Sequence, residues 1–553
     1  MEQCIPFGLS LFSSLTFDCF ALDKNAIKYF GFAEFISGLA LTLVVWTVAD
    51  LRYKFRIDTA SLPVRSASLV ITPFVGSLTL LTDYWRSSQS RVPAGGWLTP
   101  ESWQLLLAGT FLFILIVWFW YAFFRPAKFN KCNCSKFTSN VETYLLRGYQ
   151  SELAIIGDEL ARTVSNIVQY APDDLSSDKV IKIQINAFKL LMAMGSPKFC
   201  RAIVEGSPKL IINLFHEVEK QKKYNDAVRV IAKNVITAAI ENRNSFLYNE
   251  QNFFESGLEG ITRPVTTVLS NSPELIDKIN TLLSPDYSRR APWDIEQWKA
   301  YLWLLLEVFT VYVRERHATS CPKSLHLAYL QVKKIYVDLT EDLQLINLNY
   351  GSDLYTRLKM LGSLIKDMVA VLNKLAQPAD YAEQNISNII YSLITSASSV
   401  RKPRIVSRKI QYTLIWSYIL NSSELRSEAG IRILNQVHRK LLDEIKKAPN
   451  LDSLIILGYC LNVMGFNPPE ENEPYGSSWR KLHIELLDWV KVNIAPLIEE
   501  YPDIVRYCFV DGMSFDEKNN RIVIQHVRED GEKTKPQYLN VEPATKHRRR
   551  LIR

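Results

Sequence analysis

The sequence predicts a mainly α-helical protein: an N-terminal membrane region with several helical spans, then a large cytoplasmic helical domain, then a small C-terminal β-hairpin. Three observations indicate this fold class. Nearly all long uncharged runs lie between residues 30 and 124. Beyond about residue 140, apolar residues recur at the three- and four-residue steps of amphipathic helices. Near the C-terminus, two strand-like runs flank the turn-rich "DEKNN".

At 553 residues the chain is too long for one hydrophobic core, so several structural units are expected. The expected segments are an interfacial or weakly spanning N-terminus (1–27), a transmembrane region (28–125), a basic juxtamembrane connector (126–147), a cytoplasmic helical domain (148–505), and a hairpin with a basic tail (506–553).

Three stretches are expected to cross the membrane, at about 29–49, 66–82 and 103–124. A helix needs roughly 20 apolar residues to span a hydrocarbon core about 30 Å thick, and 103–124 carries no charge at all. The first stretch is interrupted only by Glu34 near one end, where a carboxylate can reach the headgroup region. The second contains Pro73 and Gly76, which membrane helices tolerate when their neighbours satisfy the freed backbone groups.

A weaker apolar stretch at 4–22 contains Pro6 and Asp18. It fits an interfacial helix lying flat on the membrane better than a fourth span, although the sequence leaves both open. Either arrangement leaves the large C-terminal part on the same side.

Lysine and arginine counts near the span ends set the orientation, because cytoplasmic loops carry the excess of these residues. The loop 50–65 and the exit after 124 are basic, whereas 83–102 has only two basic residues. The residues counted are Arg52, Lys54, Arg56 and Arg65 in the first loop, Arg86 and Arg91 in the second, and Arg125, Lys128, Lys131 and Lys136 after the third span. These counts predict a multi-pass protein of the plasma (inner) membrane with its large C-terminal domain in the cytoplasm.

The cytoplasmic part begins with "SELAIIGDELARTVSNIVQY", which reads as an amphipathic helix because Leu153, Ile156, Leu160, Val164 and Ile167 share one face. The motif "GSPK" then occurs at 195–198 and 206–209, combining a helix-ending Gly, an N-cap Ser and a first-turn Pro. "NSPELI" at 271–276 repeats the start signal.

These signals predict helices at about 178–194, 197–205 and 208–220, which is the scale of an armadillo or HEAT unit. No fixed period continues along the chain, so we expect an irregular α-solenoid, with a non-repetitive helical domain as the alternative. The apolar stretch 298–316 is divided by Glu307 and is expected to be a buried helix of this domain. Further helices are expected at 324–345, 353–375, 381–397, 405–420, 424–447, 451–464 and 479–499.

No catalytic motif is recognisable, because the phosphate-binding string G-x-x-x-x-G-K-[ST], H-E-x-x-H and G-x-S-x-G do not occur. We therefore expect no enzyme activity and no cofactor. "CNC" at 132–134 could supply two thiolates to a metal, but reduced or palmitoylated juxtamembrane cysteines explain it better. The carboxylates of "APDDLSSD" at 171–178 are better explained by helix-starting residues than by a cation site.

A net charge of +8 is too small for this length to indicate a nucleic-acid protein. The basic residues instead gather beside the spans and in the tail "KHRRR", where each is worth about 1 kcal/mol of attraction to anionic lipid. The predicted lipid-headgroup contacts are Arg125, Lys128, Lys131, Lys546, Arg548, Arg549 and Arg550.

The sequence favours a membrane-anchored helical scaffold whose cytoplasmic domain binds another protein, because stacked helical repeats present extended binding faces. The alternative is a signal-gated membrane effector, in which the helical domain is the sensor and the spans form a pore. An enzyme with an unrecognised site is the third hypothesis. The lipid bilayer is the one partner predicted directly, and the identity of any protein partner and the oligomeric state stay open.

Overall fold

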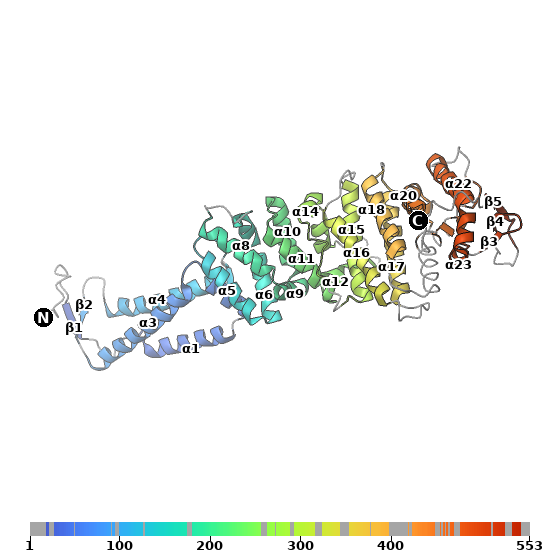
Figure 1. Cartoon of the computed structure of the whole chain (residues 1–553). Coiled ribbons are helices and arrows are strands. Elements are labelled where there is room, and N and C mark those ends of the chain that lie inside the picture. The colour runs from blue at the N-terminus through green and yellow to red at the C-terminus, as the bar shows by residue number, and fades with distance from the viewer. Residues whose placement is uncertain are drawn as a thin grey trace. The chain divides into compact units, whose positions relative to one another are not determined.

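The computed structural model divides the chain into two compact units, Met1–Ile231 and Ala232–Arg553, and the boundary falls within helix α11 (Asp226–Glu241). The protein is mainly helical, with a small antiparallel sheet near the C-terminus (Figure 1). The structure describes residues 18–21, 27–48, 50–89, 91–94, 99–124, 126, 128–173, 180–255, 263–270, 272–287, 292–315, 323–342, 353–375, 378–396, 419, 423–447, 454, 457–458, 461–462, 465–468, 476–509, 512–525 and 533–543.

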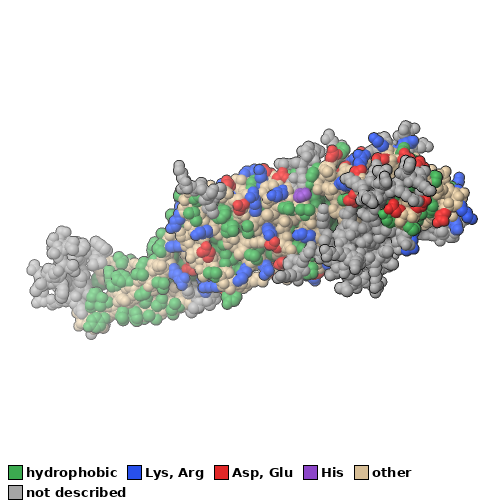
Figure 2. All heavy atoms as spheres, viewed as in Figure 1, with side chains coloured by type: hydrophobic (Ala, Val, Ile, Leu, Met, Phe, Trp, Pro, Cys, Tyr) green, Lys and Arg blue, Asp and Glu red, His purple; other side chains and the backbone are tan. Residues whose placement is uncertain are grey.

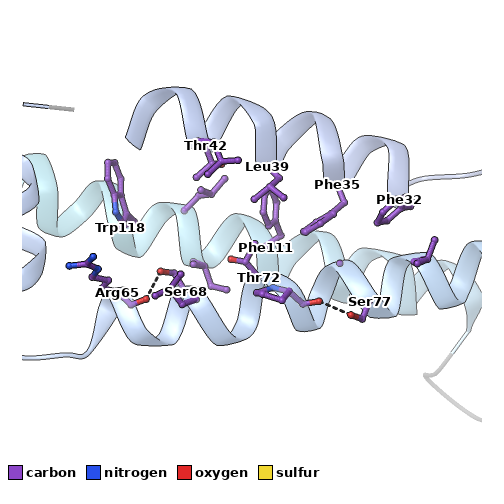
Figure 3. A pocket seen from close by; sticks show the side chains of 17 residues that line it. Phe32, Phe35, Leu39, Thr42, Arg65, Ser68, Thr72, Ser77, Phe111 and Trp118 are labelled. Atoms are coloured by element: carbon purple, nitrogen blue, oxygen red, sulfur yellow. Dashed lines mark hydrogen bonds between the residues drawn. The ribbon is translucent and has the colours of Figure 1, made fainter. Parts of the chain in front are cut away.

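Three apolar helices begin the N-terminal unit: α1 (Phe32–Val48), α3 (Val64–Ser87) and α4 (Pro100–Phe119). Short helix α2 (Leu51–Asp58) connects the first two, and α4 continues into a π-helical turn, η1 (Trp120–Phe124). Phe35 of α1 packs edge-on against Phe111 of α4, with 5.4 Å between ring centroids (Figure 3). Figure 2 shows hydrophobic side chains covering the visible face of these helices.

Polar contacts fix one end of the three helices. The backbone N–H of Phe32 donates to Asp83 of α3 at 2.9 Å, and the N–H of Tyr29 donates to the buried amide oxygen of Gln104 on α4 at 2.9 Å. Helices α1 and α4 therefore begin at the end where α3 finishes, so the three run alternately up and down.

Two helices in the described part of the chain are long and apolar enough to cross a bilayer, Val64–Ser87 and Pro100–Phe124. Of the three predicted spans, two therefore have the length and composition that a membrane span needs, and whether they cross a membrane stays a prediction. Helix α1 is about 26 Å long at 1.5 Å per residue, slightly less than the hydrocarbon core. It is shorter than the expected 29–49 because Tyr29, Phe30 and Gly31 form a polar turn before it, and Asp50 caps α2 directly after it.

The prediction of a helix over 4–22 is wrong for residues 18–21. Asp18–Ala21 is a strand, β1, which pairs antiparallel with β2 (Arg91–Ala94). Residues 4–17 lie outside the described part of the chain. The strand pairs with residues about 70 positions further along, and such non-local pairing leaves no periodicity in a short stretch.

In the described residues, the packed part of the N-terminal unit contains the first part of α11 and six helices before it: α5 (Cys134–Arg147), α6 (Gln150–Ala161), α7 (Val164–Tyr170), α8 (Lys182–Met194), α9 (Pro197–Gly206) and α10 (Pro208–Gln221). Each of the first three packs against the helix three places further on, α5 on α8, α6 on α9 and α7 on α10. The predicted connector 126–147 is thus largely a packed helix.

The apolar face predicted for the first cytoplasmic helix is buried, with Ile156, Leu160 and Ile167 each fully enclosed. The helix is not continuous, however, because a turn at Arg162–Thr163 separates α6 from α7. The Thr163 hydroxyl at this turn accepts the Phe129 N–H at 2.7 Å. A contact from the preceding connector therefore stabilises a break that the helical spacing does not reveal.

The two GSPK motifs end and start helices as predicted, but their serines differ. Ser196 caps α9 by accepting the Phe199 N–H at 3.4 Å. Ser207 makes no capping bond and instead donates to Asp158 at 2.8 Å. Ser272 of "NSPELI" caps α14, accepting the Leu275 N–H at 3.3 Å.

The C-terminal unit contains the rest of the helices described. They are α12 (Phe246–Glu255), α13 (Pro264–Ser270), α14 (Pro273–Lys278), α15 (Ile295–Glu315), α16 (Lys323–Asp342), α17 (Asp353–Leu372), α18 (Asp380–Ser396), η4 (Glu424–Arg426), α20 (Glu428–Lys447), α22 (Gly476–Glu500), α23 (Pro502–Val505) and η5 (Arg506–Cys508). Here several helices pack mainly against the one numbered two higher, as in α15 on α17, α16 on α18 and α18 on α20.

Most helices predicted for this unit are found within a few residues of their expected bounds; the expected helix 405–420 and most of 451–464 lie outside the described residues. The apolar stretch 298–316 is buried helix α15, as predicted. Its Trp298, Tyr301 and Phe309 are fully enclosed, and Glu307 forms an ion pair with Arg263.

The predicted hairpin is present and gains a third strand. Strand β3 (Met513–Asp516) pairs antiparallel with β4 (Arg521–Ile524), and β4 pairs antiparallel with β5 (Gln537–Asn540). Asn520 takes a left-handed conformation (φ 50°) at the end of the turn, which Asn tolerates better than most residues. The third strand buries Leu539 and gives the hairpin the extra partner that a two-stranded ribbon needs.

Candidate functional site

A cluster of bonded charged and polar side chains lies where the apolar helices of the N-terminal unit meet its packed helices. It is built on α2, whose position between α1 and α3 brings its arginines to α6. Asp50 caps this helix by accepting the Arg52 N–H at 3.4 Å. We call the contacts of α2 with α6, η1 and α5 the junction.

Arg56 is the centre of the junction and is only 5% exposed. Its Nε and Nη2 donate to the two carboxylate oxygens of Glu159 on α6 at 2.8 and 2.7 Å. Two parallel charge-assisted hydrogen bonds of this kind fix the orientation of both side chains. Its Nη1 donates to the carbonyl of Ala122 in η1 at 2.8 Å, so one guanidinium ties α2 to both α6 and the end of α4.

A second arginine extends the network toward α9 and α10. Arg52 contacts Asp158 at 3.2 Å, and Asp158 in turn accepts the Ser207 hydroxyl at 2.8 Å. Arg52 and Arg162 also lie 3.5 and 3.8 Å from the carboxylate of Glu159. The excess positive charge around Glu159 offsets part of the cost of burying its carboxylate.

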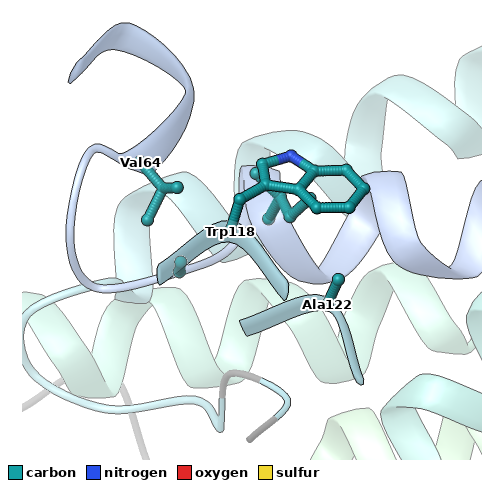
Figure 4. Packing of buried hydrophobic residues seen from close by; sticks show 5 residues of the cluster. Val64, Trp118 and Ala122 are labelled. Atoms are coloured by element: carbon teal, nitrogen blue, oxygen red, sulfur yellow. The ribbon is translucent and has the colours of Figure 1, made fainter. Parts of the chain in front are cut away.

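The end of α4 fits into the junction through small and aromatic side chains. Ala122 is fully buried beside Trp118, Ile57, Ala60 and Val64, and Figure 4 shows Trp118, Ala122 and Val64 in this cluster. The π-helical turn at Trp120–Phe124 is an irregularity of a type often found at functional positions. It presents the Ala122 carbonyl to Arg56.

Helix α5 holds the other side of α2. Phe55 packs edge-on against Phe137 and Tyr144 with ring centroids 5.4 and 6.1 Å away. The side-chain amide of Asn133 donates to the Thr59 carbonyl at 2.9 Å, and that of Asn140 donates to the Asp58 carbonyl at 3.2 Å. These bonds satisfy carbonyls at the C-terminal end of α2 that no helical partner can reach.

The structure places two of the seven predicted lipid-headgroup residues. Lys128 and Lys131 are exposed in the turn between η1 and α5. Arg125, Lys546, Arg548, Arg549 and Arg550 lie outside the described residues. The predicted contact with lipid headgroups stays a prediction for all seven.

Of the two other candidate sites, the CNC motif at 132–134 is described in full and the acidic stretch 171–178 only in part. Cys132 is exposed, whereas Cys134 is buried. Asp173 of the acidic stretch is exposed and lies 3.2 Å from Lys223, and residues 174–178 are outside the described part. Within the residues that the structure describes, no group of three or more His, Cys, Asp or Glu side chains could hold a metal ion.

Sequence spacing did not reveal a pair of buried histidines in the C-terminal unit. His438 on α20 and His483 on α22 are 8% and 1% exposed, and His483 lies 3.0 Å from the Gly465 carbonyl. Burial, with a smaller effect of His483, lowers the pKa of His438 to about 4. Burial likewise lowers the pKa of His483, against the opposing hydrogen bond to Gly465.

The free energy of unfolding of the C-terminal unit should therefore decrease in mild acid. His438 takes up a proton near pH 6.5 when unfolded but near pH 4 when folded, so its contribution is complete above pH 6.5 and is lost as the pH falls toward 4. From pH 7 to pH 5 the loss should be about 2 kcal/mol, measured by thermal or urea unfolding. His438→Gln should flatten this dependence, whereas His326→Gln, at an exposed histidine of the same unit, should leave it unchanged.

The charged and polar side chains of the junction contact one another and backbone groups, and they link the apolar helices to the packed helices of the same unit at several points. Comparison of the chain with protein-family models, with curated proteins and with solved structures finds no match.

Proposed function

We propose that the chain is an integral membrane protein that holds a large helical domain at the inner face of the plasma (inner) membrane, where this domain binds another protein. The observation that carries the proposal is the junction. The bidentate Arg56–Glu159 pair and the Asn133 and Asn140 contacts attach the packed helices directly to the connection between two apolar helices. An anchor that positions a domain needs such a rigid attachment.

Burial supports insertion of α3 and α4 into a bilayer. Only 22% of the apolar window of each helix is buried inside the protein, whereas a core helix of a soluble protein is mostly covered. An exposed apolar surface of this extent marks an interaction or membrane site. Large exposed side chains on the two helices include Leu69, Val70, Phe74, Leu105, Leu112 and Phe113.

We further propose that α1 is a third span, made long enough by its flanking turns, and that the lysine and arginine counts set the orientation. The up-and-down arrangement of α1, α3 and α4 then places α2 and the packed helices on the cytoplasmic side. Lys128 and Lys131 then lie on the same side of the membrane as α2, where they can contact anionic headgroups.

The packing also supports an irregular solenoid as the architecture of the binding domain. Helices α5, α6 and α7 each start about 45 residues before the helix on which they pack, as in an armadillo or HEAT array. The C-terminal unit changes to packing between alternate helices. This change of repeat explains why no fixed period runs through the sequence, and stacked helices of this kind present extended binding faces.

One observation favours a second candidate function, the signal-gated effector. Arg56 bonds both Glu159 of α6 and the Ala122 carbonyl at the end of α4, so a displacement of α6 by a bound partner would act on an apolar helix. In the effector, the junction would transmit a signal from the helical domain to the spans. In the anchor, it would hold the helical domain in place at the membrane.

Replacement of the apolar helices separates the two functions. In a chimaera, the apolar parts of α1, α3 and α4 are exchanged for unrelated spans of the same topology, while residues 50–63 and 118–124 keep the junction intact. Anchoring predicts that the chimaera restores whatever phenotype a deletion reveals, because the domain is still correctly placed.

The control chimaera has the same foreign spans and Glu159→Gln, which weakens the junction. If the first chimaera fails although it is membrane-inserted, and the native protein makes liposomes conductive, the effector function replaces the anchor. Resistance to alkaline extraction confirms insertion in each case.

A further inference from the structure

An apolar groove of about 550 Å³ lies among α1, α3 and α4. Figure 3 shows Leu39 and Thr42 of α1, Thr72 of α3 and Phe111 of α4 around it, with Arg65 and Trp118 toward one end. The proposed function gives these helices no ligand, so the groove needs its own explanation.

Two of the aromatic rings that line the groove, Phe35 and Phe111, pack closely on glycines. A Cβ atom on Gly38 would lie 2.8 Å from Cε1 of Phe111, and one on Gly76 would lie 2.5 Å from Cε1 of Phe35. Both rings therefore pack directly on helix backbone. Because this close packing fixes the positions of the two rings, the groove beside them is a feature of the fold.

The walls of the groove are suited to an apolar chain. The hydroxyls of Ser68 and Ser77 donate to carbonyls of α3 at 2.9 Å each, and that of Thr42 donates to the Gly38 carbonyl of α1 at 2.7 Å. Because these three hydroxyls donate within their own helices, a bound molecule needs no polar groups to satisfy them.

The two ends of the groove differ in charge. At one end the side chain of Arg65 is 58% exposed and contacts Asp58 through Nη1 alone, at 3.2 Å. Among the described residues, its Nε and Nη2 have no hydrogen-bond partner. Near the other end, one cation, Lys28, lies beside two carboxylates, Asp83 at 2.9 Å and Glu34 at 3.7 Å. Among the described residues that line the groove, Arg65 is the cation that favours a negatively charged headgroup, and its planar guanidinium suits phosphate.

The length of the groove fits a lipid chain. Its lining on α3 runs from Arg65 to Leu80, which is about 22 Å at 1.5 Å per residue. Half of the hydrocarbon core is about 15 Å thick, so one acyl chain of one leaflet can lie along the groove.

We infer that the groove binds one acyl chain of an anionic phospholipid of the inner leaflet, with the lipid phosphate held by Arg65. The inference rests on the proposed insertion of α3 and α4 with Arg65 at the inner face. Such a lipid would fill the space between α1 and the other two helices next to the junction, and would make their packing dependent on membrane composition.

Photo-crosslinking of the full chain in nanodiscs tests the inference. The discs contain three parts phosphatidylcholine and one part phosphatidylglycerol, and benzoylphenylalanine replaces Thr72 in the groove. Mass spectrometry should show a ratio of captured phosphatidylglycerol to captured phosphatidylcholine about tenfold above the ratio in the bilayer, as one charge-assisted contact implies. The same group at Phe113, which is 65% exposed and outside the groove, should capture both lipids in their bulk ratio.

Arg65→Gln should abolish the enrichment at position 72, and Arg86→Gln, the same charge change at the other end of α3, should retain it. Equal enrichment in both variants, or the bulk ratio at position 72, overturns the inference. Crosslinks to a second copy or to residues 1–26 would assign the groove to a different occupant and overturn it too. Alkaline extraction separates failure of the lipid site from failure of the proposed membrane insertion. A chain that resists extraction but shows no enrichment contradicts the lipid site alone.

Discussion

Arg56→Ala should lower the free energy of unfolding of the N-terminal unit by about 3–5 kcal/mol, the range for breaking a buried ion pair. The substitution leaves the Glu159 carboxylate, which is 5% exposed, without its two best donors. It also removes the Nη1 donor to the Ala122 carbonyl. Urea unfolding of the full chain in detergent, followed by circular dichroism, measures the loss, and limited proteolysis should show α2 and α6 becoming cleavable first.

Two variants show whether burial of the charge is the cause. Arg65→Ala removes an arginine whose pair with Asp58 is exposed, so it should cost less than about 1 kcal/mol. Combining Arg56→Met with Glu159→Leu should recover most of the stability, because no charge is then left buried without a partner. If Arg56→Ala costs no more than Arg65→Ala, the junction does not hold the unit together, and the proposed rigid anchor loses its main support.

Local signals in the sequence predicted much of the fold. Ser196 and Ser272, each followed by proline, mark helix starts because capping depends on residues within one turn. The apolar runs that became α3 and α4 were recognisable because span length is also a local property. The strands β3 and β4 were predicted from two strand-like runs around a turn-rich segment, and β5 was missed because its partner β4 is separated from it by a longer connection.

The junction could not be predicted for the same reason. Arg56 and Glu159 are separated by 103 positions, and neither lies in a recognisable motif. In the count from which the membrane orientation was predicted, Arg56 resembles any other basic residue of the loop 50–65, yet it is buried and bonded to a helix of the packed region. The turn at Arg162–Thr163 is similarly hidden, because Phe129, which bonds to it, lies 34 residues earlier.

The two compact units should unfold as separate transitions, and a buried carboxylate in the second unit allows a test. Glu250 of α12 is 6% exposed and accepts hydrogen bonds from the N–H groups of Val265 and Thr266 at 2.9 Å each and from the Thr266 hydroxyl at 2.5 Å. It therefore satisfies donors in the first turn of α13 that have no helical partner. Glu250→Ala leaves these donors buried, at a cost of about 3 kcal/mol.

That cost should appear in one transition only. Each unit has its own core, so Glu250→Ala should shift the unfolding of Ala232–Arg553 and leave that of Met1–Ile231 in place, the reverse of Arg56→Ala. Glu250→Gln retains a carbonyl acceptor and should cost less than the alanine variant. Glu296→Ala, at a half-exposed carboxylate paired with Lys299 in the same unit, should cost less than about 1 kcal/mol. If either buried substitution moves both transitions together, the chain unfolds as one cooperative body, and a partner bound to the second unit could then act on the junction through stability alone.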